Sequence, residues 1–389
     1  MDKKSISAAL KKNAMLIVLV LVYLFFLILT KGGIFKPSSF TELINQNAYV
    51  YILGTGMLMC MLTGGNIDLS CGAFVCLLGA VGGVFMIVQG MNTGLSILLL
   101  LLIGVVYGVV LGFLIAYVHI PPWIATLAGF LSFRGLGTSI LSANSKTGSL
   151  APFPVSFQNL FYGRVFPSEK GVFNWPCFFF GLLMAAAVVL VIFTTRKNRL
   201  AKGYEADSMK TAALKSGLGA AVIILVMTRL ALDGGIPTTL LWVAGIVLIY
   251  SFITGKTTIG RHFYVVGGNI EAARLSGVNT RRIMFLAYLN MAILTAIATF
   301  TVVARSQSAY ADVGKNFEMD AISACVVGGV SASGGAGTVL GMVVGATLIG
   351  VINLGMSLIS LDANYQRVVK GFVLLAAVVF DILSKKRER

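Results

Sequence analysis

Long runs of apolar residues recur along the chain and are separated by short polar segments. The run from Ala14 to Leu29 has no polar group except the Tyr23 hydroxyl. Because a helix rises 1.5 Å per residue, about 20 such residues span the hydrocarbon core of a bilayer. A transmembrane barrel would instead alternate apolar and polar residues over about ten positions. The pattern therefore predicts an all-α integral membrane protein, a polytopic bundle of 10–12 transmembrane helices.

The expected spans leave no stretch long enough for a soluble domain, so we expect a single membrane domain over residues 1–389. The segment 319–331 is short for a full crossing and is expected to be a re-entrant half-helix. The first span lacks a small-residue cleavage pattern and is expected to be a retained anchor. The expected spans are 13–30, 46–63, 70–89, 94–118, 122–141, 174–194, 217–232, 237–253, 284–304, 319–331, 336–359 and 366–383.

Composition agrees with a bilayer environment, since 57% of the 389 residues are hydrophobic and only 11% are charged. Soluble domains carry about 25% charged residues. Small residues repeat every fourth position in Gly104-x3-Gly108-x3-Gly112 and in Gly337-x3-Gly341-x3-Gly345. Small faces of this kind let helix backbones approach closely in lipid. We therefore expect both glycine faces to be helix contacts.

The net charge of +16 is concentrated in a few segments. Lys and Arg gather in cytoplasmic loops, so four basic segments separated by even numbers of spans place both termini in the cytoplasm. The same charges attract anionic lipid heads. Nucleic-acid binding is excluded because there is no soluble basic domain. The basic segments are the N-terminus with Lys3, Lys4, Lys11 and Lys12, the loops 195–216 and 254–283, and the tail with Lys385, Lys386, Arg387 and Arg389.

Enzyme chemistry has no support in the sequence. The two histidines, His119 and His262, have no nucleophile pattern beside them. Gly255-Lys256-Thr257 lacks the earlier glycine of a phosphate-binding loop, because position 250 is Tyr250. The five cysteines form no CxxC or Cys/His cluster, so we expect no metal, no disulfide and no cofactor. A pump built on this chain would take its energy from a partner.

Two polar breaks interrupt the apolar pattern, one in each half of the chain. The first break is Gly64–Ser70 and the second is Gly328–Gly335. Paired interruptions of this kind indicate an internal inverted repeat with a central site, although ordinary interhelical turns are the alternative. A pathway for a neutral, hydroxyl-rich substrate would use polar side chains near the breaks. Our candidates for the pathway or its gates are Asn66, Asp68, Ser70 and Arg134. The alternative for Asp68 and Arg134 is a structural role in holding helices together.

The loop 254–283 is expected to contain a short helix outside the membrane. Asn269 is its expected N-cap, Glu271 lies in its first turn and Gly277 ends it. Ala272 and Ala273 leave one side of this helix slim enough to enter a groove. A surface helix on the lipid interface is the alternative.

These residues resemble known motifs. Glu271-Ala272-Ala273-x3-Gly277 resembles the coupling-loop motif of bacterial ABC importer permeases, EAA-x3-G. More specifically, the chain resembles permease subunits of binding-protein-dependent sugar importers of the ribose, xylose and galactose class. The segments that carry the resemblance lie in order from about 45 to 383. They are Gly65–Ser70, Pro122–Gly129, Phe133–Leu136, Val266–Asn269 with Glu271–Gly277, Gly328–Ser331 through Gly337–Gly341, and Val369–Gly371.

The chain departs from the family pattern in its first motif and in its length. Asn66 and Cys71 replace Gly and Val in the family's first motif, GGIDLSVG. The chain is also longer than family members of about 320 residues with about ten helices. Its extra part looks like a two-helix insertion at 174–232. This layout resembles the xylose and multiple-monosaccharide branch.

The resemblance implies a multi-pass subunit of the bacterial inner membrane that moves a pentose or hexose. It implies a second permease copy, two ABC ATPase subunits docked at Glu271, Ala272, Ala273 and Gly277, and an extracytoplasmic sugar-binding protein. Within the same superfamily, nucleosides or branched-chain amino acids are the alternative substrates. An ion-coupled secondary transporter would need an ion-coupling residue inside the bundle. A scaffold without a pathway would show no substrate dependence.

Overall fold

The computed structural model describes residues 14–206 and 208–386. The terminal charges Lys3, Lys4, Lys11, Lys12, Arg387 and Arg389 lie outside the described residues. The longer helices are α2 (Ala14–Leu29), α3 (Pro37–Leu62), α4 (Cys71–Gly83), α5 (Thr93–Ala116), α6 (Pro122–Asn144), α8 (Trp175–Ala201), α9 (Met209–Leu232), α10 (Thr238–Lys256), α13 (Thr280–Ser306), α15 (Val339–Leu358) and α16 (Ala363–Lys386). The shorter helices are η1 (Gly33–Phe35), η2 (Val84–Val88), α7 (Val155–Tyr162), α11 (Thr258–Gly268), α12 (Ile270–Leu275) and α14 (Phe317–Val327).

Strands contribute only two short antiparallel pairs among the described residues. Strand β1 (Ser149–Leu150) pairs with β4 (Ala309–Tyr310), with Ser149 opposite Tyr310. Strand β2 (Arg164–Val165) pairs with β3 (Ile236–Pro237), with Arg164 opposite Pro237. Both pairs tie the segment 145–174 to the helical bundle.

Every expected span contains a helix in the described part of the chain, which confirms the all-α fold, although α14 ends at Val327 before the expected 331 and α15 begins at Val339 after the expected 336. Eight helices are long and apolar enough to cross a membrane. α14, with 11 residues, is the half-length helix expected near 319–331. α3 begins at Pro37, well before the expected 46, because its first turns are polar and the hydropathy pattern does not detect them. Pro37 suits the first position of a helix, where no backbone donor is needed.

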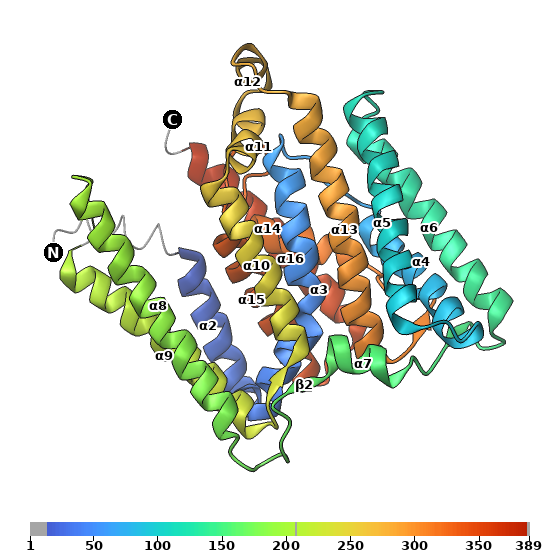
Figure 1. Cartoon of the computed structure of the whole chain (residues 1–389), viewed down its shortest axis with the longest axis horizontal. Helices are drawn as coiled ribbons and strands as arrows, with labels where there is room; N and C mark the ends of the chain where they lie inside the picture. Colours follow the sequence, from blue (N-terminus) through green and yellow to red (C-terminus); the bar gives the residue numbers. More distant parts are fainter. Residues whose placement is uncertain (1–13, 207, 387–389) are drawn as a thin grey trace.

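Figure 1 shows α3 near the middle of the bundle, with α13 beside it and α5, α4 and α6 beyond. The α8–α9 hairpin leans away at the opposite edge (Figure 1). α11, α12 and the turn between α8 and α9 lie toward one side, whereas α7 and β2 lie at the other. The basic loops 195–216 and 254–283 are therefore on one side, as an even number of crossings requires. Their assignment to the cytoplasm rests on the positive-inside rule.

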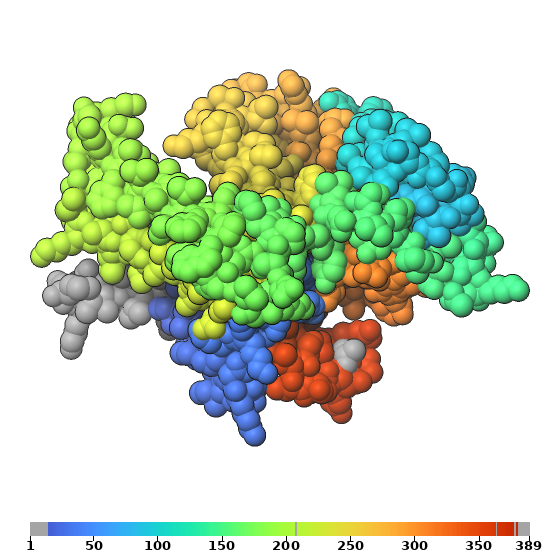
Figure 2. Space-filling model, turned by 60° about the horizontal axis from the view of Figure 1, so that its bottom comes forward, coloured from blue at the N-terminus to red at the C-terminus, as the bar shows by residue number. Residues whose placement is uncertain are grey.

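Figure 2 looks toward the face that carries α7, which is the expected outer face. The green residues of the segment 145–174 cover its middle, between the α8–α9 hairpin and the α4–α6 region. This segment is therefore a folded cover and contains its own helix, α7.

The expected glycine faces are helix contacts, except that Gly337 lies before the start of α15 at Val339, with a φ of +145°. A Cβ added to Gly104 would lie 3.1 Å from the Ala296 Cβ, and one added to Gly108 would lie 3.0 Å from the Leu289 Cα. The face at Gly104, Gly108 and Gly112 thus seats α5 against α13. On α15, a Cβ at Gly345 would overlap the Ala324 carbonyl oxygen of α14. Close backbone approach of this kind replaces the hydrophobic effect as the source of helix association in lipid.

Candidate functional site

The two polar breaks lie against each other, although more than 250 residues separate them in sequence. The Gly335 amide in the second break donates a hydrogen bond of 3.2 Å to the Leu62 carbonyl at the end of α3. A Cβ on Gly65, in the first break, would overlap the Ala332 carbonyl oxygen. Gly65 also has a φ of +75°, so both its backbone and its surroundings require glycine. The breaks therefore meet backbone to backbone.

A third segment, the end of α11, completes this contact. A Cβ on Gly267 would overlap the Leu62 carbonyl oxygen and lie 2.6 Å from the Gly335 amide nitrogen. We call the set Leu62, Gly65, Gly267, Ala332 and Gly335 the glycine junction. Through this junction, α11 contacts the end of α3, just before the first break, and the second break itself.

A tyrosine holds the same helix to the segment that follows the second break. The Tyr264 hydroxyl on α11 donates a hydrogen bond of 3.0 Å to the Gly337 carbonyl. Desolvation by burial raises the pKa of the Tyr264 phenol above its ordinary value. The group therefore stays protonated at neutral pH and keeps its role as a donor.

The candidates of the first break face inward. Asp68 is 1% exposed and accepts hydrogen bonds from the Ser70 amide at 2.8 Å and the Ser70 hydroxyl at 2.5 Å. The Ser70 hydroxyl also lies 2.6 Å from the Tyr107 hydroxyl of α5. Asn66 donates to the Thr63 carbonyl at 3.1 Å. In this conformation, Asp68 and Ser70 are joined to each other and organise the entry into α4.

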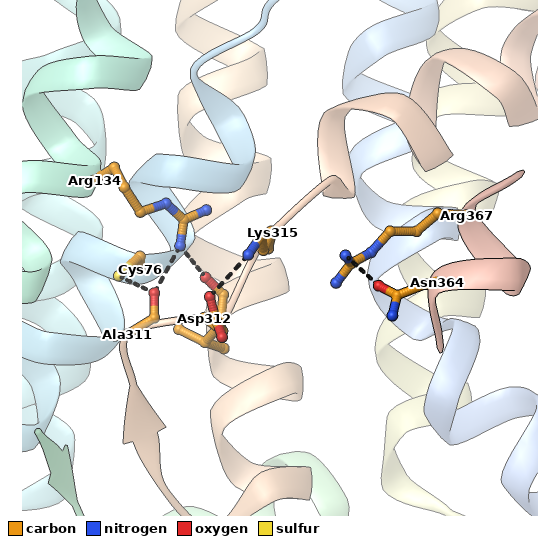
Figure 3. A network of polar contacts seen from close by, with 8 residues as sticks. Cys76, Arg134, Ala311, Asp312, Lys315, Asn364 and Arg367 are labelled. Atoms are coloured by element: carbon orange, nitrogen blue, oxygen red, sulfur yellow. Dashed lines mark hydrogen bonds and ion pairs between the residues drawn. The ribbon is translucent and has the colours of Figure 1, made fainter. Parts of the chain in front are cut away.

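Arg134 is separate from that group and holds a different loop. Its Nη1 donates to the Ala311 carbonyl at 3.0 Å and the Val313 carbonyl at 2.8 Å. Figure 3 shows Arg134 reaching from α6 to this loop, with the Cys76 thiol on the same Ala311 carbonyl. The loop leads into α14, so Arg134 positions the start of the half-helix.

Glu318, in the first turn of α14, is a buried acidic group that our sequence candidates did not include. It is 4% exposed, and its Oε2 has no hydrogen-bond partner among the described residues. A Cβ on Gly72 would overlap this oxygen. The Nη2 of Arg134 is also buried without a partner. The signal was present in the sequence, because Glu318 and Asp320 form an acidic pair at the start of an expected span.

The short helix expected in the loop 254–283 is present as α12. The Asn269 side chain accepts from the Ala272 amide at 2.9 Å, which confirms the N-cap. Gly277 has a φ of +80°, and the amide of Val278 donates to the Ala273 carbonyl at 3.0 Å. This is the pattern of a Schellman motif.

One expectation about α12 needs correction. Ala273 is 0% exposed, because it packs into the main core of the chain itself. It therefore does not enter a groove on a partner. The other residues of α12, Ile270–Ala272 and Arg274–Leu275, are exposed, and Leu275 is 87% exposed.

The five cysteines are free and buried, and no group of His, Cys, Asp and Glu suited to a metal occurs among the described residues. Altogether, the structure joins Asp68 to Ser70 and places Arg134, on α6, against the separate loop that leads into α14. It connects α11, just before α12, to the end of α3 and to the second break.

Comparisons with known proteins agree with this architecture. The family described as "Branched-chain amino acid transport system / permease component" matches residues 39–378. The xylose transport system permease protein of Haemophilus influenzae is 32% identical over 382 residues, which cover 98% of this chain and 98% of the relative. Its counterpart from Escherichia coli is 31% identical over 381 residues, 98% of this chain and 94% of the relative. The ribose import permease protein of Escherichia coli is 28% identical over 352 residues, 89% of this chain and 88% of the relative. No solved structure gives a significant match.

Proposed function

Because the chain belongs to the family of branched-chain amino acid transport system permease components, we propose that it is the transmembrane subunit of an ABC importer for a monosaccharide. Pentoses are the first candidates. The observation that carries this proposal is the alignment with xylose permeases over 98% of both chains. An alignment of that extent has to include the α8–α9 hairpin. The chain is a multi-pass protein of the bacterial inner membrane.

The partners follow from this function. We infer two permease copies, two ATP-binding subunits below α12, and a sugar-binding protein on the face that carries α7. The contact of α11 with the end of α3 and with the second break supports a route by which a docked ATPase moves the centre of the bundle. Ala273 and Gly277 maintain the conformation of α12. Glu271 and Ala272 lie on its exposed surface. Asn66, Asp68, Ser70 and Arg134 hold the segments beside the pathway.

Sugar uptake into vesicles tests the proposal. The chain would be reconstituted with its ATPase and binding protein, and radiolabelled xylose, arabinose, ribose, galactose and glucose would be offered. Leucine and a nucleoside serve as competitors, since the family description names branched-chain amino acids. We expect ATP-dependent uptake of a monosaccharide that neither competitor blocks. Sugar uptake without the ATPase would indicate an ion-driven carrier. Uptake of leucine and of no sugar would show that the proposed substrate class is wrong.

Leu275→Asp is expected to reduce recovery of the ATPase with the purified permease about tenfold. Leu275 is 87% exposed at the end of α12, and a buried apolar anchor at an interface is worth about 1–2 kcal/mol or more. Leu214→Asp is the matched control, because Leu214 is 65% exposed at the start of α9. Copurification on an affinity-tagged permease measures the effect. Equal losses in both variants would argue against docking at α12.

The α8–α9 hairpin is proposed to be an insertion on a complete core. Its ends are already side by side, since the Asn174 amide donates to the Ala231 carbonyl at 3.0 Å. Replacing Trp175–Leu230 by a short Gly/Ser linker is therefore expected to leave a permease that still binds its ATPase. Lipid would cover the apolar surface that the hairpin leaves on α3. Size-exclusion chromatography in detergent and copurification check this, and an aggregated product would show that the hairpin is part of the core.

A further inference from the structure

A cavity of about 430 Å³ opens between α14, α16 and α3. It is lined in part by Tyr49, Phe317, Met319, Asp320, Arg367 and Lys370. None of these was among our sequence candidates. The volume is ample for a monosaccharide, which occupies a few hundred Å³ at most.

The carboxylate at the centre of the cavity has a free acceptor. Asp320 is 4% exposed. Its Oδ2 accepts from the Tyr49 hydroxyl at 2.5 Å and from the Lys370 Nζ at 3.0 Å. No hydrogen bond to Oδ1 is present among the described residues, so this oxygen is available to a hydroxyl in the cavity. The attraction within a buried ion pair seldom stabilises the fold by more than the desolvation of the two charges costs.

An aromatic wall and a second cation complete the lining. The Tyr49 and Phe317 rings stack with centroids 3.7 Å apart and planes 17° apart. The Arg367 guanidinium, which extends from α16 (Figure 3), makes one hydrogen bond, of 3.3 Å, to the Asn364 side chain. The cavity thus offers an acceptor, planar donors and an apolar face. This combination suits a ring with hydroxyls at its edge and C–H groups on its face.

The charges of the cavity lining are largely paired. Asp320 neutralises Lys370, and Lys315, at the cavity edge, pairs with Asp312 at 3.3 Å. Arg367 has no acidic partner among the described residues, and its guanidinium can donate to the hydroxyls of a neutral sugar. Ionisable side chains within membrane-spanning helices generally face a partner or a water-filled path. α16 is not among the eight apolar spans of the described residues, in keeping with its cations facing this cavity.

The geometry points to this cavity as a direct binding site for the transported monosaccharide, with a hydroxyl donating to Asp320 Oδ1, Arg367 donating to ring oxygens, and the sugar face on the Tyr49–Phe317 wall. This inference rests on the proposed function and names residues that would select the sugar.

Thiol labelling of Met319→Cys tests the proposed sugar site in the reconstituted complex of permease, ATPase and binding protein. Met319 is 46% exposed and lines the cavity, and the five native cysteines are buried. The transported sugar is expected to slow maleimide labelling at least threefold. Thr147→Cys, in the exposed loop before β1, should label at the same rate with and without sugar. Protection by the sugar acid and not by the neutral sugar would overturn the ligand class.

A charge-neutral double variant, Asp320→Asn with Lys370→Gln, avoids leaving a buried cation unpaired. We expect it to bind the ATPase normally and to take up sugar about tenfold more slowly with saturating loaded binding protein, as loss of hydrogen bonds to a charged group predicts. Wild-type uptake of sugar, combined with unprotected Met319→Cys and an unimpaired double variant, would overturn this inference and leave the proposed function standing. Absence of sugar uptake by the wild-type complex would instead remove the proposed function.

Discussion

Gly267→Ala is expected to abolish ATP-driven uptake, whereas Gly268→Ala, one residue away, should leave it almost unchanged. A methyl group at Gly267 would overlap the Leu62 carbonyl oxygen and lie 2.6 Å from the Gly335 amide. It would therefore separate the two groups whose hydrogen bond joins the end of α3 to the second break. Neither obstacle is a flexible side chain, so the backbone would have to move, at a cost of about 1–3 kcal/mol or more.

Gly268 provides a close control because a Cβ there has no atom within 4 Å. The two variants share a helix, a substitution type and a loss of backbone freedom. Vesicle uptake and thermal unfolding of the detergent-purified permease would be measured for both. We expect uptake to fall more than tenfold only for Gly267→Ala. Similar uptake by the two variants would show that the glycine junction tolerates separation and does not carry the coupling.

Arg134→Met is expected to reduce uptake at least tenfold. The change removes both hydrogen bonds that hold the Ala311 and Val313 carbonyls. Hydrogen bonds from charged donors contribute about 1.5–3 kcal/mol each. The change also removes the cation near the buried carboxylate of Glu318. The start of α14 should then lose its fixed position beside α4.

The measurement compares uptake and protease sensitivity of the loop 311–316 in Arg134→Met with those in Arg229→Met. Arg229 is a suitable control because its guanidinium lies 3.8 Å from the Phe35 ring centroid, a contact worth about 0.5–1 kcal/mol. Arg134→Lys should recover part of the activity, because an ammonium keeps the charge and the donors but its side chain is shorter and lacks the planar guanidinium. Normal uptake by Arg134→Met would show that α14 is positioned without this arginine.

Hydropathy was sufficient to locate the membrane-spanning helices, because the backbone polar groups of each span must form hydrogen bonds within that span in lipid. A long apolar run therefore determines a crossing locally, as the agreement between the run at 14–29 and α2 shows. The same locality explains the cap at Asn269 and the end at Gly277, which depend on a few neighbouring residues. The starts of α3 and α9 were missed because polar turns extend those helices beyond the apolar spans.

The sequence by itself determined the all-helical membrane fold, the two breaks and the short helix α12. Each depends on residues within a few turns of one another. The tertiary structure alone decided that the breaks meet at Gly65 and Ala332, that Ala273 is buried, and that Tyr49, Asp320 and Lys370 share one cavity. The Tyr49–Asp320 contact joins α3 to α14 across 271 residues of sequence, and the Lys370–Asp320 contact joins α16 to α14 across 50 residues. Hydropathy describes how a helix meets lipid, and it carries no information on which polar side chains face one another across the bundle.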